Sequence, residues 1–99
     1  MPADLIEIAG EAFYESEEWA AAREQYEWII KMTFSRMEYG DIYARSFYML
    51  GRIYEHMGEK IKSRDYYNKF LQLWKGADPG IQEIEEAWIR LAGLRSKGR

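Results

Sequence analysis

Residues 46–59 read SFYMLGRIYEHMGE, and this stretch decides the fold because it carries a helical pattern with a glycine inside it. Phe47, Leu50 and Tyr54 recur at intervals of three and four residues, which is the period of one face of an amphipathic helix. Gly51 falls within that helix, where glycine is less favourable than alanine by roughly 1 kcal/mol. The pattern therefore predicts a helix in which a close contact requires the absence of a side chain.

The same pattern occurs a second time, nearer the N-terminus. When Gly10 is aligned with Gly51, residues 7–32 lie over residues 48–73 without a gap, and the apolar positions agree in kind. A repeat of this kind has to be recognised before any other fold assignment. The identical pairs are Gly10 with Gly51, Glu18 with Glu59, Arg23 with Arg64, and Tyr26 with Tyr67.

Each copy is predicted to form two helices. In the first copy an apolar face ends at residues 14–18, where Ser16 is expected to cap the next helix. In the second copy Gly58 is expected to end the first helix as a C-terminal glycine cap. A fifth helix is predicted from about Ile81 to Leu94, after a segment rich in glycine and proline. The chain has no valine and one threonine, so no segment shows a strand pattern.

Composition bounds the class of protein. With 99 residues, of which 47% are apolar and 16% aromatic, the chain is predicted to form a single domain with a core. It has no cysteine, which excludes disulfides and thiolate metal sites. No apolar run approaches the roughly 20 residues that span a bilayer, and residues 1–13 contain no basic residue of a signal peptide. We therefore expect a cytoplasmic protein without a membrane segment.

The spacing in the second copy resembles the tetratricopeptide repeat (TPR). The resemblance rests on a bulky residue, leucine, glycine and tyrosine, then a turn glycine, a small residue and a second tyrosine; these are Phe47, Leu50, Gly51, Tyr54, Gly58, Ser63 and Tyr67. It covers nearly the whole chain, and residues 70–94 resemble the C-terminal end of longer prokaryotic TPR proteins. In that family small residues let the two helices of a repeat cross closely, which implies this role for Gly10, Ala22, Gly51 and Ser63.

The resemblance implies an all-α fold of about five helices, in which antiparallel helix–turn–helix repeats stack as a short right-handed α-solenoid. The sequence departs from the family pattern in two ways. Glu17 in the first copy occupies the position that Gly58 has in the second, and the repeat period is 41 residues rather than about 34. The expected single domain, residues 1–99, comprises repeat one (about 3–33), an extended loop (about 33–41), repeat two (about 42–75) and a closing helix (about 80–96). Because solenoids usually need about three units, either another copy covers the ends or the chain belongs to a longer array.

Motifs that carry chemistry are missing from the sequence. It contains no glycine-rich phosphate-binding motif, and its one histidine, His56, has no second metal ligand on its helical face. The carboxylates of residues 83–86 fit a solvated helix face. We therefore predict no catalysis, no cofactor and no metal site. Basic residues gather at 60–64 and 95–99, but the net charge of −3 disfavours binding to nucleic acid.

The resemblance implies that the first helix of each repeat lines a concave groove that binds a peptide or helix of a partner protein. Family members that grip a C-terminal carboxylate use lysine and asparagine where this chain has Glu7 and Glu11, so that ligand is not expected here. A mixed-charge peptide with an apolar anchor fits better. The predicted groove residues are Glu7, Glu11, Tyr14, Arg45, Tyr48, Arg52, Glu55, His56, Glu86 and Ile89.

The alternative function is self-assembly through the open ends of the solenoid. Its candidate contact is the N-terminal face of Leu5, Ile8 and Ala12, together with the surplus aromatic residues Trp28 and Trp74. Residues 1–40 hold nine acidic and three basic side chains, a net charge of −6, whereas residues 41–99 hold eight acidic and eleven basic, a net charge of +3. This asymmetry fits head-to-tail contact between copies, steering of a charged partner, or simple scatter of charge.

Overall fold

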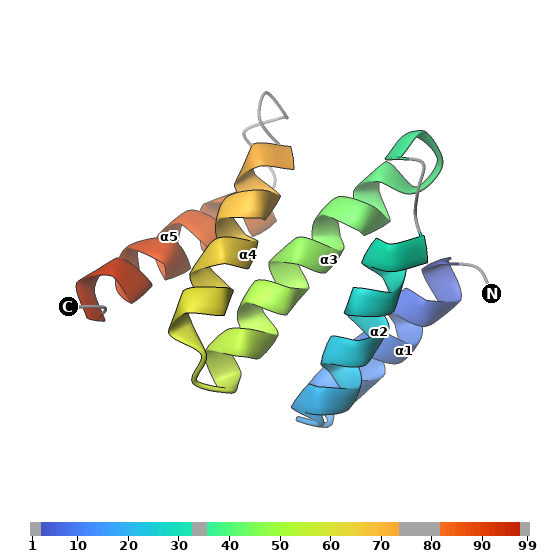
Figure 1. Ribbon diagram of the computed structural model, residues 1–99, viewed down its shortest axis with the longest axis horizontal. Helices are drawn as coiled ribbons and strands as arrows, with labels where there is room; N and C mark the ends of the chain where they lie inside the picture. Colours follow the sequence, from blue (N-terminus) through green and yellow to red (C-terminus); the bar gives the residue numbers. More distant parts are fainter. Residues whose placement is uncertain (1–2, 33–35, 74–81, 98–99) are drawn as a thin grey trace.

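The computed structural model describes residues 3–32, 36–73 and 82–97, with side chains described for residues 5–31, 42–73 and 83–94. The described chain forms five helices and no strand, so the all-α prediction is confirmed. The helices follow one another across the molecule, with α1 and α5 at opposite ends (Figure 1). Their bounds are α1 Ala3–Glu15, α2 Trp19–Met32, α3 Arg36–His56, α4 Lys60–Leu73 and α5 Gln82–Lys97. Trp74 lies outside the described residues.

Helix α3 is longer than predicted, because it begins at Arg36 and takes in most of the segment expected as an extended loop over residues 33–41. The reason lies in the helical period. The period of 41 residues exceeds by seven the roughly 34 residues that the resemblance implied, and seven residues add about two turns at 3.6 residues per turn. An insertion of two turns keeps Phe47, Leu50 and Tyr54 on the face that meets the rest of the molecule. The chain therefore absorbs the extra residues as helix.

The turns after α1 and α3 have the same hydrogen bonds, shifted by one repeat. The amide of Glu18 donates to the carbonyl of Phe13 at 2.9 Å, and the amide of Glu59 donates to that of Tyr54 at 2.9 Å. The residue before each of these donors has a positive φ, 60° at Glu17 and 81° at Gly58. This is the Schellman arrangement of a helix C-terminus. The predicted glycine cap at Gly58 is confirmed.

The expected cap at Ser16 is wrong, because Ser16 lies in the turn that ends α1, where its amide donates to the carbonyl of Ala12 at 3.1 Å. The carbonyl of Glu18 accepts the first hydrogen bond of α2, from the amide of Ala22 at 2.9 Å, so Glu18 occupies the N-cap position. The chain therefore completes the Schellman turn before the next helix starts. Glu59 has the same place before α4, since its carbonyl accepts from the amide of Ser63 at 3.0 Å.

Replacing Glu17 with glycine is expected to stabilise the protein by about 1 kcal/mol. A side chain at φ 60° costs about 1–2 kcal/mol, which glycine does not incur. The free energy of unfolding in urea measures the change. Glu15→Gly is the matched control, because it removes a similar exposed carboxylate from regular helix and should destabilise by about 1 kcal/mol. Destabilisation by Glu17→Gly would contradict the turn geometry.

The two glycines inside the helices make room for tyrosine rings. A Cβ at Gly51 would lie 2.8 Å from ring carbons of Tyr67, and a Cβ at Gly10 would lie 2.8 Å from a ring carbon of Tyr26. The small residues Ser63 and Ala22 were expected to face the glycines, and the tyrosine rings were not part of that prediction. Ser63 does reach Gly51, since its hydroxyl donates to the Gly51 carbonyl at 2.7 Å. The crossing therefore combines a small residue with a ring that fills the glycine gap.

The core consists of two clusters that follow the order of the chain. The first joins α1, α2 and the second half of α3 around Ile6, Tyr26 and Leu50. The second joins α3, α4 and α5 around Phe47 and Phe70. Each helix packs on its neighbours in sequence, and α1 also contacts α3. None of the helices described is long and apolar enough to cross a membrane.

Candidate binding groove

A groove of about 280 Å³ lies between α1 and α3, with the first turn of α5 at one end. Helix α1 contributes residues one turn apart, and α3 presents a matching row across from them. Six of the ten residues predicted to bind a partner line it: Glu7, Glu11, Tyr14, Arg45, Tyr48 and Arg52. Three residues of the lining were not predicted, namely Glu15, Met49 and Glu83. Glu15 lies one helical turn after Glu11, and that spacing could have identified it.

Glu7 and Arg45 form a bidentate ion pair across the groove. Arg45 Nε donates to one carboxylate oxygen of Glu7 at 2.9 Å, and Arg45 Nη2 donates to the other at 3.0 Å. Glu7 is only 8% exposed, so its charge is removed from water and compensated in the same place. The carboxylate of Glu7 therefore joins α1 to α3 and contributes little net charge to a ligand. In this respect the structure differs from the prediction that Glu7 would repel an acidic ligand.

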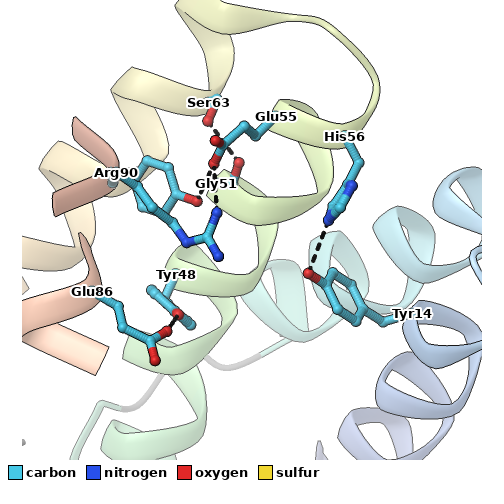
Figure 2. A network of polar contacts seen from close by, with 9 residues as sticks. Tyr14, Tyr48, Gly51, Glu55, His56, Ser63, Glu86 and Arg90 are labelled. Atoms are coloured by element: carbon cyan, nitrogen blue, oxygen red, sulfur yellow. Dashed lines mark hydrogen bonds and ion pairs between the residues drawn. The ribbon is translucent and has the colours of Figure 1, made fainter. Parts of the chain in front are cut away.

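The pair between α1 and α3 has a counterpart between α3 and α5. The alignment of Gly10 with Gly51 places Tyr48 at the position of Glu7 and Glu86 at the position of Arg45. The Tyr48 hydroxyl donates to the Glu86 carboxylate (Figure 2). Burial raises the pKa of Tyr48 to about 12, and the hydrogen bond to Glu86 adds to the shift. The same two positions thus join consecutive units, once by an ion pair and once by a phenol and a carboxylate.

Glu55 joins three helices. It accepts a hydrogen bond from the hydroxyl of Tyr67 on α4 at 2.8 Å, and Arg90 on α5 approaches the same oxygen at 3.4 Å (Figure 2). Glu55 and Glu86 were predicted as contact residues for a partner, but neither lines the groove, and both make hydrogen bonds within the protein. Ile89 is also absent from the lining and is 71% exposed on α5.

Arg52 lies against two aromatic rings of the groove. Its guanidinium carbon is 5.3 Å from the ring centre of Tyr14 and 5.9 Å from that of Tyr48. Both distances fit a cation–π contact. Arg52 Nε is buried without a hydrogen-bond partner in the described part of the chain. Arg52 therefore forms part of the groove wall, and its replacement would disturb packing as well as charge.

His56 completes an aromatic cluster at the end of α3. Its ring stacks on Trp19 with 4.1 Å between ring centres and an angle of 5° between the planes. Its Nε2 lies 3.2 Å from the hydroxyl of Tyr14 (Figure 2). The Tyr14 ring packs edge-on against the rings of both Trp19 and His56. His56 was predicted as a groove residue, and it contacts the groove through Tyr14 without lining it.

Tyr26 has a buried hydroxyl that is unpaired within the described part of the chain. Its ring is fully buried in the gap left by Gly10, and its oxygen has no hydrogen-bond partner among the described residues. Burial raises the pKa of this phenol, and the charges of Glu11 and Glu7 raise it further. In the second repeat the equivalent hydroxyl, that of Tyr67, donates to Glu55. Tyr14 occupies the position of Glu55 in the first repeat, so that position has no carboxylate to accept a hydrogen bond from Tyr26.

The rim of the groove is acidic. Glu11, Glu15 and Glu83 form no ion pair with any residue that the structure describes. Across the whole lining four carboxylates face two guanidinium groups, and one of each is neutralised in the pair of Glu7 with Arg45. The groove therefore offers an excess of negative charge beside the partly exposed ring of Tyr14, which suits a cationic side chain with an apolar neighbour.

The sequence was compared with protein-family models and with curated proteins. No protein-family model matches the chain, and no curated protein matches its sequence. Among the described residues, no three histidine or carboxylate side chains gather closely enough to hold a metal ion.

Proposed function

We propose that this protein is a protein–protein interaction module of TPR type, which binds a peptide or helix of a partner protein in the groove between α1 and α3. The observation that supports this function is the groove itself, which brings six of the predicted contact residues together from two helices. The matching turns after α1 and α3 support a framework of repeated helix–turn–helix units, which the proposal stacks as a short right-handed solenoid. The proposed function involves neither catalysis nor a cofactor. We place the protein in the cytoplasm as part of this proposal.

The charge of the rim defines the partner's chemistry. A lysine or arginine beside an apolar residue would meet Glu11 and Glu15 together with the partly exposed ring of Tyr14. A free C-terminal carboxylate would meet the same acidic rim and be repelled. Because Arg45 neutralises Glu7, this repulsion comes from the carboxylates of Glu11, Glu15 and Glu83 rather than from Glu7.

Reversing the charge of Glu11 is expected to weaken binding of a basic peptide by about tenfold. Peptides would first be selected on the wild-type protein from a random display library, and lysine or arginine beside an apolar residue should be enriched. Their dissociation constants are then measured for wild type and Glu11→Lys. Because Glu11 is exposed and forms no ion pair with a described residue, the fold should persist, and a lost attraction of about 1.4 kcal/mol corresponds to tenfold.

Glu24→Lys is the control, because it makes the same change of charge at an exposed position of α2 outside the groove. It should leave the dissociation constants within about twofold. Equal weakening by both variants would show a general effect of net charge. Enrichment of acidic peptides, or the absence of any selected peptide, would contradict binding at this groove.

A second candidate function is self-assembly. Helix α1 exposes Leu5 and Ile8, with 52% and 62% of their surface accessible, as the prediction of an N-terminal contact face required. If Leu5→Glu with Ile8→Glu leaves the association state unchanged in sedimentation equilibrium, this face is not the contact.

A further inference from the structure

Helix α5 has a second apolar face that nothing in the described chain covers. Its inner face is buried against α3 and α4 through Ala87, Leu91 and Leu94. A separate stripe is exposed, formed by the apolar Trp88 and Ala92 with the acidic Glu85 at its N-terminal end, and Trp88 is 56% exposed. These three residues are spaced by three and four, which places them along one side of the helix. Ile89 extends the apolar surface at its edge.

The internal repeat identifies what such a stripe contacts elsewhere. The residues equivalent to Trp88 are Phe47 and Ile6, which are 7% and 2% exposed. Phe47 contacts Tyr66 of α4, and Ile6 packs in one cluster with Tyr26 of α2. The residues equivalent to Ala92 are the two glycines that receive tyrosine rings. In both repeats, therefore, this face of the helix is covered by another helix.

The distribution of charge along α5 favours a second copy of the same helix as the partner that covers this stripe. The acidic residues of α5, including Glu85, lie in its first half, and its basic residues, Arg90, Arg95 and Lys97, lie in its second half. An antiparallel second copy of α5 would place the acidic half of each helix against the basic half of the other. A parallel copy would place like charges together.

We propose that α5 pairs with α5 of a second copy, antiparallel and with a twofold axis near Arg90. In this register Trp88 lies opposite Ala92 of the second copy, where the neighbouring Gly93 leaves open space around its Cα. Position 85, an acid, lies opposite position 95, a base, and this pairing occurs twice across the axis. One register thus matches the large residue with small ones and the acid with the base. Such a contact is isologous and closes as a dimer.

The inference deepens the self-assembly function by naming its surface, occupant and register, and it does not depend on the groove. A pair of 16-residue helices buries less than the roughly 1,600 Å² of a standard interface. We therefore expect a reversible dimer that dissociates on dilution.

Sedimentation equilibrium on charge-exchanged variants of the full chain tests the register. Glu85→Lys and Arg95→Glu each create two like-charged contacts in the symmetric dimer, and each should weaken it by about tenfold or more. The variant that carries both changes restores two opposite pairs, and its dissociation constant should return to within about threefold of wild type. A double variant no tighter than the single variants would overturn the register.

Tryptophan replacements test the surface. Trp88→Glu should abolish the dimer, whereas Trp28→Glu should not, although Trp28 on α2 is also 56% exposed. Far-UV circular dichroism checks that both variants keep the helical content of the wild type. A wild-type monomer at all concentrations would overturn the proposal and self-assembly together. If Leu5→Glu with Ile8→Glu abolishes association and Trp88→Glu does not, self-assembly stands and the contact through α5 is refuted.

Discussion

Raising the pH through about 10 to 11.5 is expected to unfold the protein cooperatively. Among the tyrosines whose side chains are described, four are almost fully buried, namely Tyr26, Tyr48, Tyr54 and Tyr67. Burial raises the pKa of each phenol above its ordinary value of 10, to about 12 for Tyr48 and further for the others, and acceptor carboxylates add to the shift for Tyr48, Tyr54 and Tyr67. The folded protein therefore keeps these phenols protonated at a pH where the unfolded chain ionises them.

The sign of the effect follows from proton binding. Above about pH 10 the unfolded chain binds fewer protons than the folded one, so stability falls as pH rises. Each buried phenol contributes a slope of roughly 1.4 kcal/mol per pH unit, and four together contribute roughly 5 kcal/mol per unit. The total free energy of unfolding of a small domain is about 5–15 kcal/mol. The stability given by these neutral phenols is thus fully present below pH 10 and lost as pH approaches their folded-state pKa values.

Urea unfolding at a series of pH values measures this slope, and phenolate absorbance reports ionisation in the same samples. Tyr48→Phe is the matched control, because it removes one titrating group and should make the pH dependence shallower by about one proton. If all tyrosines titrated near pH 10 while the helical signal persisted, the buried phenols would not be coupled to folding.

Gly51→Ala is expected to destabilise the protein by roughly 2 kcal/mol, as overpacking of a buried site does. The new Cβ would lie 2.8 Å from Cδ1 and Cε1 of Tyr67 and 3.0 Å from its Cγ. These atoms include the base of a buried ring whose hydroxyl donates to Glu55, so the ring has little freedom to move aside. Overpacking of this kind costs about 1–3 kcal/mol and exceeds the gain of up to about 1 kcal/mol in helix propensity. Thermal and urea unfolding measure the net change.

Two other glycines provide the comparison. Gly10→Ala meets Cε2 and Cζ, at the far end of the Tyr26 ring, and that ring has no hydrogen bond at its hydroxyl to a described residue, so its cost should be smaller. Gly93→Ala meets nothing within 4 Å and should be neutral or stabilising. An unchanged or higher stability for Gly51→Ala would refute the role of the tyrosine ring in the crossing.

Helical periodicity explains why much of the fold was predictable. The spacing of Phe47, Leu50 and Tyr54 marked a buried face, and the glycine between them marked a close approach. The sequence also predicted the turn at Gly58. What periodicity could not show is which side chain fills the glycine gap, because Tyr67 lies on the following helix and was assigned only to the core. The extra two turns of α3 were also hidden, since a lengthened repeat fits an inserted loop as well as an inserted helical segment.

The candidate groove was predictable by position and not by pairing. The register of the repeat brought residues such as Glu11, Tyr14 and Arg52 to one surface. The ion pair of Glu7 with Arg45 and the hydrogen bond of Tyr48 to Glu86 depend on side-chain conformations between helices far apart in the sequence. Sequence spacing carries no information about them. For the same reason Glu55 and Glu86 were expected to face a partner, whereas both bind neighbouring helices.

The two core clusters also bear on how the chain can fold during its synthesis. The buried residues of the first cluster all lie between Ile6 and Tyr54, and those of the second lie between Ala44 and Leu94. Most of the first core can therefore close while the ribosome is still adding the residues of α5. Most contacts in each half join consecutive helices, so little loop entropy is lost before they form. A nascent chain stalled after α4 would already hold the α1–α3 surface that the groove requires.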